Sequence, residues 1–103
     1  MEVGIDLVLV SRFINKSEHF INRVLTEKEL SLYSLLNEEK RIIFLASRWA
    51  CKEAIYKATQ DEKYLSYSIL NNEKGKPYVD GFPNMSISIS HDGDYVIAIC
   101  IIC

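Results

Sequence analysis

The sequence predicts an α+β fold in which an antiparallel sheet packs against helices, one of them long and central. Three observations carry this prediction. An apolar run occupies residues 3–10, a stretch without glycine or proline covers residues 41–60, and alternating apolar segments separated by turns follow from residue 65. The order of a strand, then helices, then several antiparallel strands indicates helices on one face of a sheet. We expect a single domain over residues 1–103.

The opening strand covers Val3 to Val10, which is rich in valine, isoleucine and leucine and too short for a helix of its own. We therefore predict a buried strand. Asp6 interrupts it, and a charged carboxylate left unpaired there would cost on the order of several kcal/mol. Backbone donors near a strand end or a metal ion would both satisfy this residue, and the residue alone favours neither. Gly4 would allow another backbone or a ligand to approach closely.

Residues 11–25 alternate apolar and polar residues, which is typical of a short amphipathic helix or of a broken pair of helices beginning near Ser11. Arg12, Lys16 and Arg23 lie on the polar side. These three basic residues would form a docking patch for an acidic partner, although a solvated helix face explains them equally well.

A second helix is predicted from Glu27 to Leu36 because Thr26-Glu27-Lys28-Glu29 has the pattern of a capping box. In this motif the threonine hydroxyl and the glutamate carboxylate each accept a hydrogen bond from a free backbone N–H group of the first turn. The residues expected to face the core are Leu30, Tyr33 and either Leu36 or Leu35.

The long central helix is predicted from Arg41 to Gln60. Glu53 and Lys57 continue a stripe of small residues on its wheel, whereas Arg48 and Lys52 form the plainest solvent-facing sector. The helix alone favours an ordinary surface pair between Glu53 and Lys57, worth about 0.3–0.5 kcal/mol. A functional site becomes the better interpretation only if other segments supply partners.

The last 40 residues predict two hairpins. Leu65 to Leu70 and Pro77 to Val79 flank a polar turn and form the first of them. In the second, residues 86–90 alternate strictly and direct Ile87 and Ile89 inward, an Asp-Gly turn follows, and residues 95–102 form the most apolar strand.

Composition limits the classes of function. A chain of 103 residues with 49% hydrophobic residues can bury a modest core, and its net charge of -2 argues against nucleic-acid binding through bulk charge. Neither a membrane-spanning run nor a signal peptide is evident, so we expect a soluble, cytoplasmic protein. The three cysteines show neither disulfide nor zinc spacing, and we expect them to act as small apolar residues.

Several separated segments together resemble one family, the holo-[acyl-carrier-protein] synthases, which are small bacterial 4′-phosphopantetheinyl transferases. They are GIDLVLVSR (4–12), RVLTEKEL (23–30), FLASRWACKEAIYKA (44–58), EKGKPYV (73–79) and SISISHDGDYVIAI (86–99), in the family's order. The resemblance implies the fold of that family and a magnesium-dependent transfer of phosphopantetheine from coenzyme A to a serine of an acyl carrier protein. It also implies a homotrimer whose active sites lie between neighbouring subunits.

The resemblance implies a role for individual residues. Asp6 and Glu53 would bind Mg²⁺, a choice that suits a cation taking one or two carboxylates plus substrate phosphates. Lys57 would neutralise the phosphates or the departing 3′,5′-ADP, and Glu53 would hold or deprotonate a water that takes the serine proton. Further coenzyme A contacts are implied for Arg48, Lys52, Ser90 and His91, with His91 also a catalytic residue, and docking of the carrier protein is implied for Arg12 and Arg23.

Two other functions compete with the active transferase. The chain carries Thr59 to Lys63 where many members of the family have a glycine-rich loop, and this change leaves fewer free backbone donors for a nucleotide. That difference favours a non-catalytic module that binds coenzyme A or a carrier protein on the same fold. In the third alternative, Glu53 and Lys57 merely form a surface ion pair on a structural domain, and His91 is an ordinary surface residue of a turn.

Overall fold

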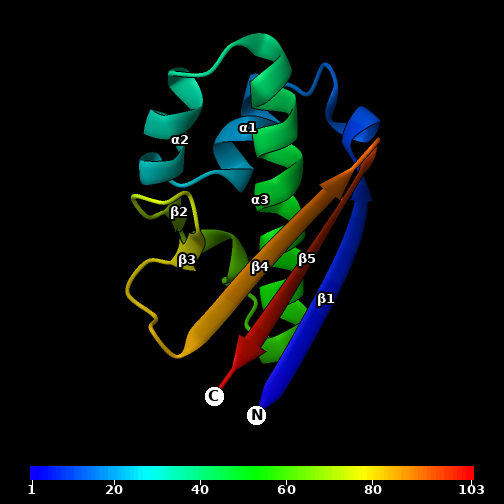
Figure 1. The fold of residues 1–103 in the computed structure, drawn as a ribbon. Coiled ribbons are helices and arrows are strands. Elements are labelled where there is room, and N and C mark those ends of the chain that lie inside the picture. Colours follow the sequence, from blue (N-terminus) through cyan, green and yellow to red (C-terminus); the bar gives the residue numbers. More distant parts are fainter.

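The computed structural model describes all residues from Met1 to Cys103 and has two layers, a sheet and the helices that cover one of its faces (Figure 1). The sheet has the strand order β1-β5-β4, and both pairings are antiparallel. The predicted α+β class is confirmed. The elements are β1 (Glu2–Leu9), η1 (Val10–Phe13), α1 (Glu18–Val24), α2 (Glu27–Ser34), α3 (Glu38–Thr59), η2 (Tyr64–Ser66), β2 (Ile69–Asn71), β3 (Pro77–Val79), β4 (Met85–Asp92) and β5 (Tyr95–Ile102).

The long helix α3 is the centre of the molecule. It begins three residues before the predicted start, because Asn37 caps it by accepting a hydrogen bond from the Lys40 N–H, and it ends where Gln60 adopts a left-handed conformation. Ten of its 22 residues are buried, all of them between Leu45 and Ala58. The buried apolar residues that it contributes to the core are Leu45, Ala46, Ala50, Cys51, Ala54, Ile55 and Ala58.

Strand β1 packs directly on the backbone of α3. A Cβ atom at Gly4 would lie 1.9 Å from the carbonyl oxygen of Ala54, so only glycine allows this approach. The prediction that the strand is buried is wrong for one of its two faces. Val3, Ile5 and Leu7 are 58%, 52% and 58% exposed, because no helix covers the outer face of the sheet (Figure 1).

The segment between β1 and α2 is the broken pair of helices that was one of the two predicted alternatives. The 3-10 turn η1 and the helix α1 are separate, and Ser17 caps α1 by accepting a hydrogen bond from the Phe20 N–H. The capping box of Thr26 and Glu29 is confirmed at the start of α2. That helix ends at Ser34, two residues earlier than predicted, and Leu35 points to solvent at 83% exposure.

Both predicted hairpins are present. The first strand of the small hairpin begins at Ile69 instead of Leu65, because Tyr64–Ser66 forms a 3-10 turn. In the larger hairpin Ile87 is buried, as predicted, and Ile89 is half-buried against the core. None of the helices combines the length and apolar character that crossing a membrane would require.

The three cysteines are free thiols. Cys51 and Cys100 are buried among apolar residues, as expected, and burial raises the pKa of Cys51 to about 12. Cys103 is exposed at the end of the chain, so the expectation that it acts as an apolar packing residue is not met within one chain.

Candidate active site

The site is built where β1 crosses α3. Asp6 is on the face of β1 that lies against α3, and its side chain is only 14% exposed. Lys57 donates from Nζ to Oδ1 of Asp6 at 3.1 Å and to the carbonyl oxygen of Ile5 at 3.0 Å. The buried acid predicted from the strand therefore meets the basic residue predicted from the helix, so Lys57 is not merely one half of a surface pair with Glu53.

Glu53 lies one helical turn before Lys57, which places their Cβ atoms about 5–6 Å apart on the same side of α3. Its carboxylate is half-buried and forms no ion pair within the chain. Tyr64 is its neighbour from the turn that follows α3. Burial raises the pKa of the Tyr64 phenol, the Glu53 carboxylate raises it further, and the positive charge of Arg23 opposes that shift.

The carboxylates of this site suit a hard divalent cation that keeps coordination positions open for water and substrate. The chain contains no cluster of three or more histidine, cysteine, aspartate or glutamate side chains that could enclose a metal ion. Asp6 and Glu53 offer two carboxylates, and Mg²⁺ commonly binds proteins through one or two carboxylates while water and substrate phosphates complete its shell. The donor set therefore fits Mg²⁺ bound together with a diphosphate.

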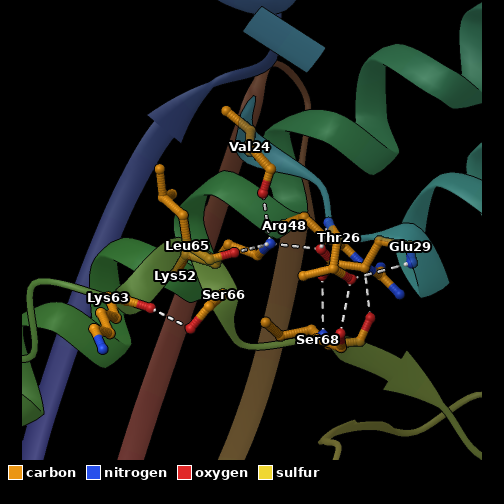
Figure 2. Close-up of polar contacts among 10 residues, drawn as sticks. Val24, Thr26, Glu29, Arg48, Lys52, Lys63, Leu65, Ser66 and Ser68 are labelled. Carbon is orange, nitrogen blue, oxygen red and sulfur yellow. Dashed lines mark hydrogen bonds and ion pairs between the residues drawn. The ribbon is translucent and has the colours of Figure 1, made fainter. Parts of the chain in front are cut away.

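Arg48 and Lys52 were predicted to face solvent and to bind phosphate, and this placement is wrong. Arg48 is 5% exposed, and its guanidinium donates to the carbonyl oxygen of Ile69 at 3.1 Å and to Oδ1 of Asn71 at 2.6 Å. Lys52 is fully buried and pairs with Glu29 (Figure 2). Burial lowers the pKa of Lys52, and the Glu29 carboxylate opposes this shift. Both charges face inward because the chain that follows α3 covers this side of the helix.

Ser90 and His91 lie away from the pair of Asp6 and Lys57 within one chain. His91 stands opposite Val96 of β5, which in turn stands opposite Val8 of β1. With about 4.8 Å between neighbouring strands, the Cα atom of His91 is roughly 10 Å from that of Val8. Ser90 alternates with His91 and is exposed on the outer face of the sheet.

The two arginines predicted to bind a carrier protein are both exposed. Arg12 lies in η1, and Arg23 lies in the last turn of α1. Asp94, in the turn between β4 and β5, holds the start of η1 in place, because its carboxylate accepts hydrogen bonds from the backbone N–H and the hydroxyl of Ser11 at 2.9 and 2.6 Å.

Sequence reasoning missed two residues near the site, Tyr64 and Glu29. Tyr64 immediately precedes the segment predicted as a strand, Leu65 to Leu70, and no motif marked it. Glu29 was recognised only as the second half of a capping box, a role that uses one of its oxygens. The one available signal was the second carboxylate oxygen of Glu29, because a buried carboxylate needs hydrogen-bond donors for both of its oxygens.

Comparisons with known proteins agree with this geometry. The sequence profile of the 4′-phosphopantetheinyl transferase superfamily matches residues 2–100. The chain is 43% identical over 99 residues to the holo-[acyl-carrier-protein] synthase of Mycoplasma mobile, an alignment that covers 96% of this chain and 86% of the relative. It is 41% identical over 103 residues to the synthase of Streptococcus thermophilus, with 90% and 87% covered.

Solved structures of the same enzymes share the fold. A holo-(acyl-carrier-protein) synthase from Bacillus anthracis, in complex with CoA (3′,5′-ADP), superposes with a TM-score of 0.87 at 28% identity, covering 98% of this chain and 94% of that one. The Helicobacter pylori enzyme in complex with coenzyme A gives a TM-score of 0.79 at 26% identity, with 98% and 99% covered. The chain belongs to the 4′-phosphopantetheinyl transferase superfamily, and within it to the holo-[acyl-carrier-protein] synthases.

Proposed function

We propose that this chain transfers the 4′-phosphopantetheine group of coenzyme A to a serine of apo-acyl carrier protein, giving the holo-carrier protein and 3′,5′-ADP. The observation that carries the proposal is the contact of Lys57 with Asp6 at 3.1 Å, with Glu53 one helical turn away. The ammonium group of Lys57 beside the carboxylates of Asp6 and Glu53 suits a diphosphate substrate. Membership of the synthase family, and the coenzyme A complexes of its structural relatives, support the same substrate.

The reaction is a displacement at phosphorus. The serine oxygen of the carrier protein attacks the β-phosphorus of coenzyme A, and a new O–P bond forms as the bond from that phosphorus to the bridging oxygen breaks. The bridging oxygen leaves with the electron pair as part of 3′,5′-ADP. Glu53 accepts the serine proton through a water, and Lys57 neutralises the charge that develops on the phosphates. To do so, Lys57 must exchange part of its contact with Asp6 for the substrate.

Asp6 and Glu53 would hold Mg²⁺ in this site. When bound, the ion supplies charge neutralisation at the diphosphate and orients it for attack. The contribution of the chain is to present two carboxylates whose positions are fixed by β1 and by α3. Since Arg48 and Lys52 are buried, Lys57 is the exposed basic residue that the second half of α3 offers to the phosphates.

We also propose that the active protein is a homotrimer and that a neighbouring subunit supplies Ser90 and His91 to each site. The separation of His91 from Asp6 within one chain supports a shared site. The uncovered outer face of the sheet supports an interface, because exposed apolar rows of this kind mark association surfaces. The exposed apolar residues of that face are Val3, Ile5, Leu7, Tyr95 and Ile97.

The remaining assignments are proposals of the same kind. The exposed Arg12 and Arg23 would bind acidic residues of the carrier protein, a contact that charge complementarity favours. Residues 1–103 would form one transferase domain. Three free thiols suit a reducing compartment, and we therefore expect the protein to act in the cytoplasm.

A transfer assay tests the function. Coenzyme A labelled in its pantetheine arm is incubated with apo-acyl carrier protein and Mg²⁺, and label on the carrier is measured after separation of the proteins. We expect stoichiometric labelling that requires Mg²⁺ and disappears when the acceptor serine is replaced by alanine. Binding of coenzyme A by calorimetry without any transfer would contradict the proposal and favour the non-catalytic module.

Mixing two inactive variants tests the shared site. Asp6→Ala and His91→Ala should each lack activity, and trimers reassembled from an equimolar mixture should regain about a quarter of the wild-type activity, because that share of sites joins two intact halves. Transfer activity after joint refolding is the measurement, and each variant refolded alone is the control. A mixture as inactive as its components would show that the two residues do not act across an interface.

A further inference from the structure

The carboxylate of Asp6 already has a positive charge of the chain beside it. Lys57 donates from Nζ to Oδ1 of Asp6 at 3.1 Å, and this is the one hydrogen bond that the Asp6 side chain receives. Asp6 is also a proposed ligand of Mg²⁺, so the ammonium group and the metal ion compete for the same negative charge. Binding of a divalent cation at Asp6 therefore requires Lys57 either to move away or to stay beside a second cation, which repels it.

Lys57 is the partner that can move. The carboxylate of Asp6 is 14% exposed and belongs to a strand whose backbone touches α3, since a Cβ atom at Gly4 would overlap the carbonyl oxygen of Ala54. The side chain of Lys57 is 52% exposed, and its ammonium group ends a flexible four-carbon stem. The packing of β1 on α3 thus fixes the position of Asp6, whereas the end of Lys57 is free to change partners.

The hydrogen bonds of Lys57 allow such an exchange without taking it away from the site. An ammonium group has three donor hydrogens. Lys57 uses one on Asp6 and one on the carbonyl oxygen of Ile5 at 3.0 Å, so one remains for a phosphate oxygen. When a second phosphate oxygen replaces Asp6, the number of hydrogen bonds is unchanged, and the bond to Ile5 keeps the ammonium group beside β1.

The charges of the site make its two ligands depend on each other. Glu53 forms no ion pair, so two carboxylates and one ammonium group together leave a single net negative charge, which binds a divalent cation weakly. A diphosphate adds negative charge and draws Lys57 from Asp6, which leaves that carboxylate to the metal ion. A metal ion at Asp6 in turn leaves Lys57 to the phosphates. Each ligand therefore increases the affinity for the other.

We propose that Lys57 is an exchangeable countercharge of Asp6, and that this exchange couples the binding of the divalent cation to the binding of coenzyme A. The identity of the two ligands rests on the proposed function. The proposal adds a property of binding that the transfer reaction does not require. By itself the protein binds a divalent cation weakly, and it takes up the cation together with the diphosphate.

The variant Lys57→Met tests this coupling in a binding experiment without carrier protein, so no turnover is needed. The probe is Mn²⁺, which takes the same oxygen ligands as Mg²⁺. Free Mn²⁺ is measured by electron paramagnetic resonance with and without saturating coenzyme A, and corrected for the Mn²⁺ that coenzyme A binds in solution. We expect the variant alone to bind Mn²⁺ about tenfold more tightly than wild type, and the factor by which coenzyme A strengthens Mn²⁺ binding to fall by about tenfold.

Two further variants separate this exchange from a general effect of charge. Lys63→Met removes the same charge from an exposed lysine that forms no ion pair, and it should leave the Mn²⁺ affinity within about twofold of wild type. Lys57→Arg keeps a positive charge beside Asp6, and it should bind Mn²⁺ no more tightly than wild type. Because Lys57 is half-exposed, we expect all three variants to be folded by circular dichroism.

The proposal is overturned if Lys57→Met binds Mn²⁺ no more tightly than Lys63→Met does, or if Lys57→Arg gains as much affinity as Lys57→Met. Absence of Mn²⁺ binding in all four proteins, even with coenzyme A, would overturn it as well. These outcomes are independent of the transfer assay. A wild type that transfers no label would refute the proposed function, while the Mn²⁺ affinities would still decide whether Lys57 competes for Asp6.

Discussion

Replacing Glu53 by glutamine, or Asp6 by asparagine, is expected to lower kcat by about a thousandfold, equivalent to about 4 kcal/mol of transition-state stabilisation. Each substitution keeps the size of the side chain but removes the negative charge that a divalent cation requires. Neither should unfold the protein. Glu53 forms no ion pair, and Asp6 pairs with a lysine that is 52% exposed, a contact worth about 1 kcal/mol or less.

The measurement is the steady-state rate of label transfer as a function of Mg²⁺ concentration, with thermal unfolding recorded on the same samples. Glu62→Gln is the matched control, because Glu62 is an exposed acid of the turn that follows α3 and should tolerate the change without loss of activity. Retention of activity within about tenfold of wild type in either Asp6→Asn or Glu53→Gln would remove that residue from the proposed metal site.

Local patterns predicted the elements of this fold well. The capping box at Thr26 fixed the start of α2 because its two hydrogen bonds depend only on residues three apart. The run from residue 41 to residue 60 predicted α3 because helix formers and the absence of glycine act within single turns. Asp6 could be recognised as unusual because a carboxylate in an apolar strand needs a partner, although its sequence could not show that Lys57 would be that partner.

Contacts between segments distant in sequence determine which side chains are buried, and local sequence patterns do not show these contacts. A helical wheel identifies a polar sector, but it does not show which segments cover that sector. The wheel placed Arg48 and Lys52 in a solvent-facing sector. In the structure, β2 and the turn before it pack over both residues, and Glu29, 23 residues from Lys52, supplies the countercharge. The opposite error concerned β1, whose continuous apolar run resembled a strand buried on both faces. Its outer face is apolar yet uncovered within one chain.

Replacing Gly4 by alanine is expected to destabilise the chain strongly, by about 3 kcal/mol or more. The added Cβ would lie 1.9 Å from the carbonyl oxygen of Ala54 and 2.8 Å from the backbone nitrogen of Ala58. Both obstacles are backbone atoms of α3, so no change of rotamer can relieve the overlap and β1 must move away from the helix. Since Asp6 lies two residues further along β1, the same movement should weaken its contact with Lys57 and lower the transfer rate.

Urea unfolding at a fixed protein concentration measures this effect. With a slope of about 1.5 kcal/mol per molar urea, a loss of about 3 kcal/mol lowers the midpoint by about 2 M. Gly81→Ala is the matched control, because Gly81 has a positive φ of 80° but no atom within 4 Å of an added Cβ, and backbone strain alone should cost about 1–2 kcal/mol. Equal midpoints for Gly4→Ala and Gly81→Ala would mean that the contact between β1 and α3 costs no more than backbone strain in an open turn. The close packing that places Asp6 on Lys57 would then need another explanation.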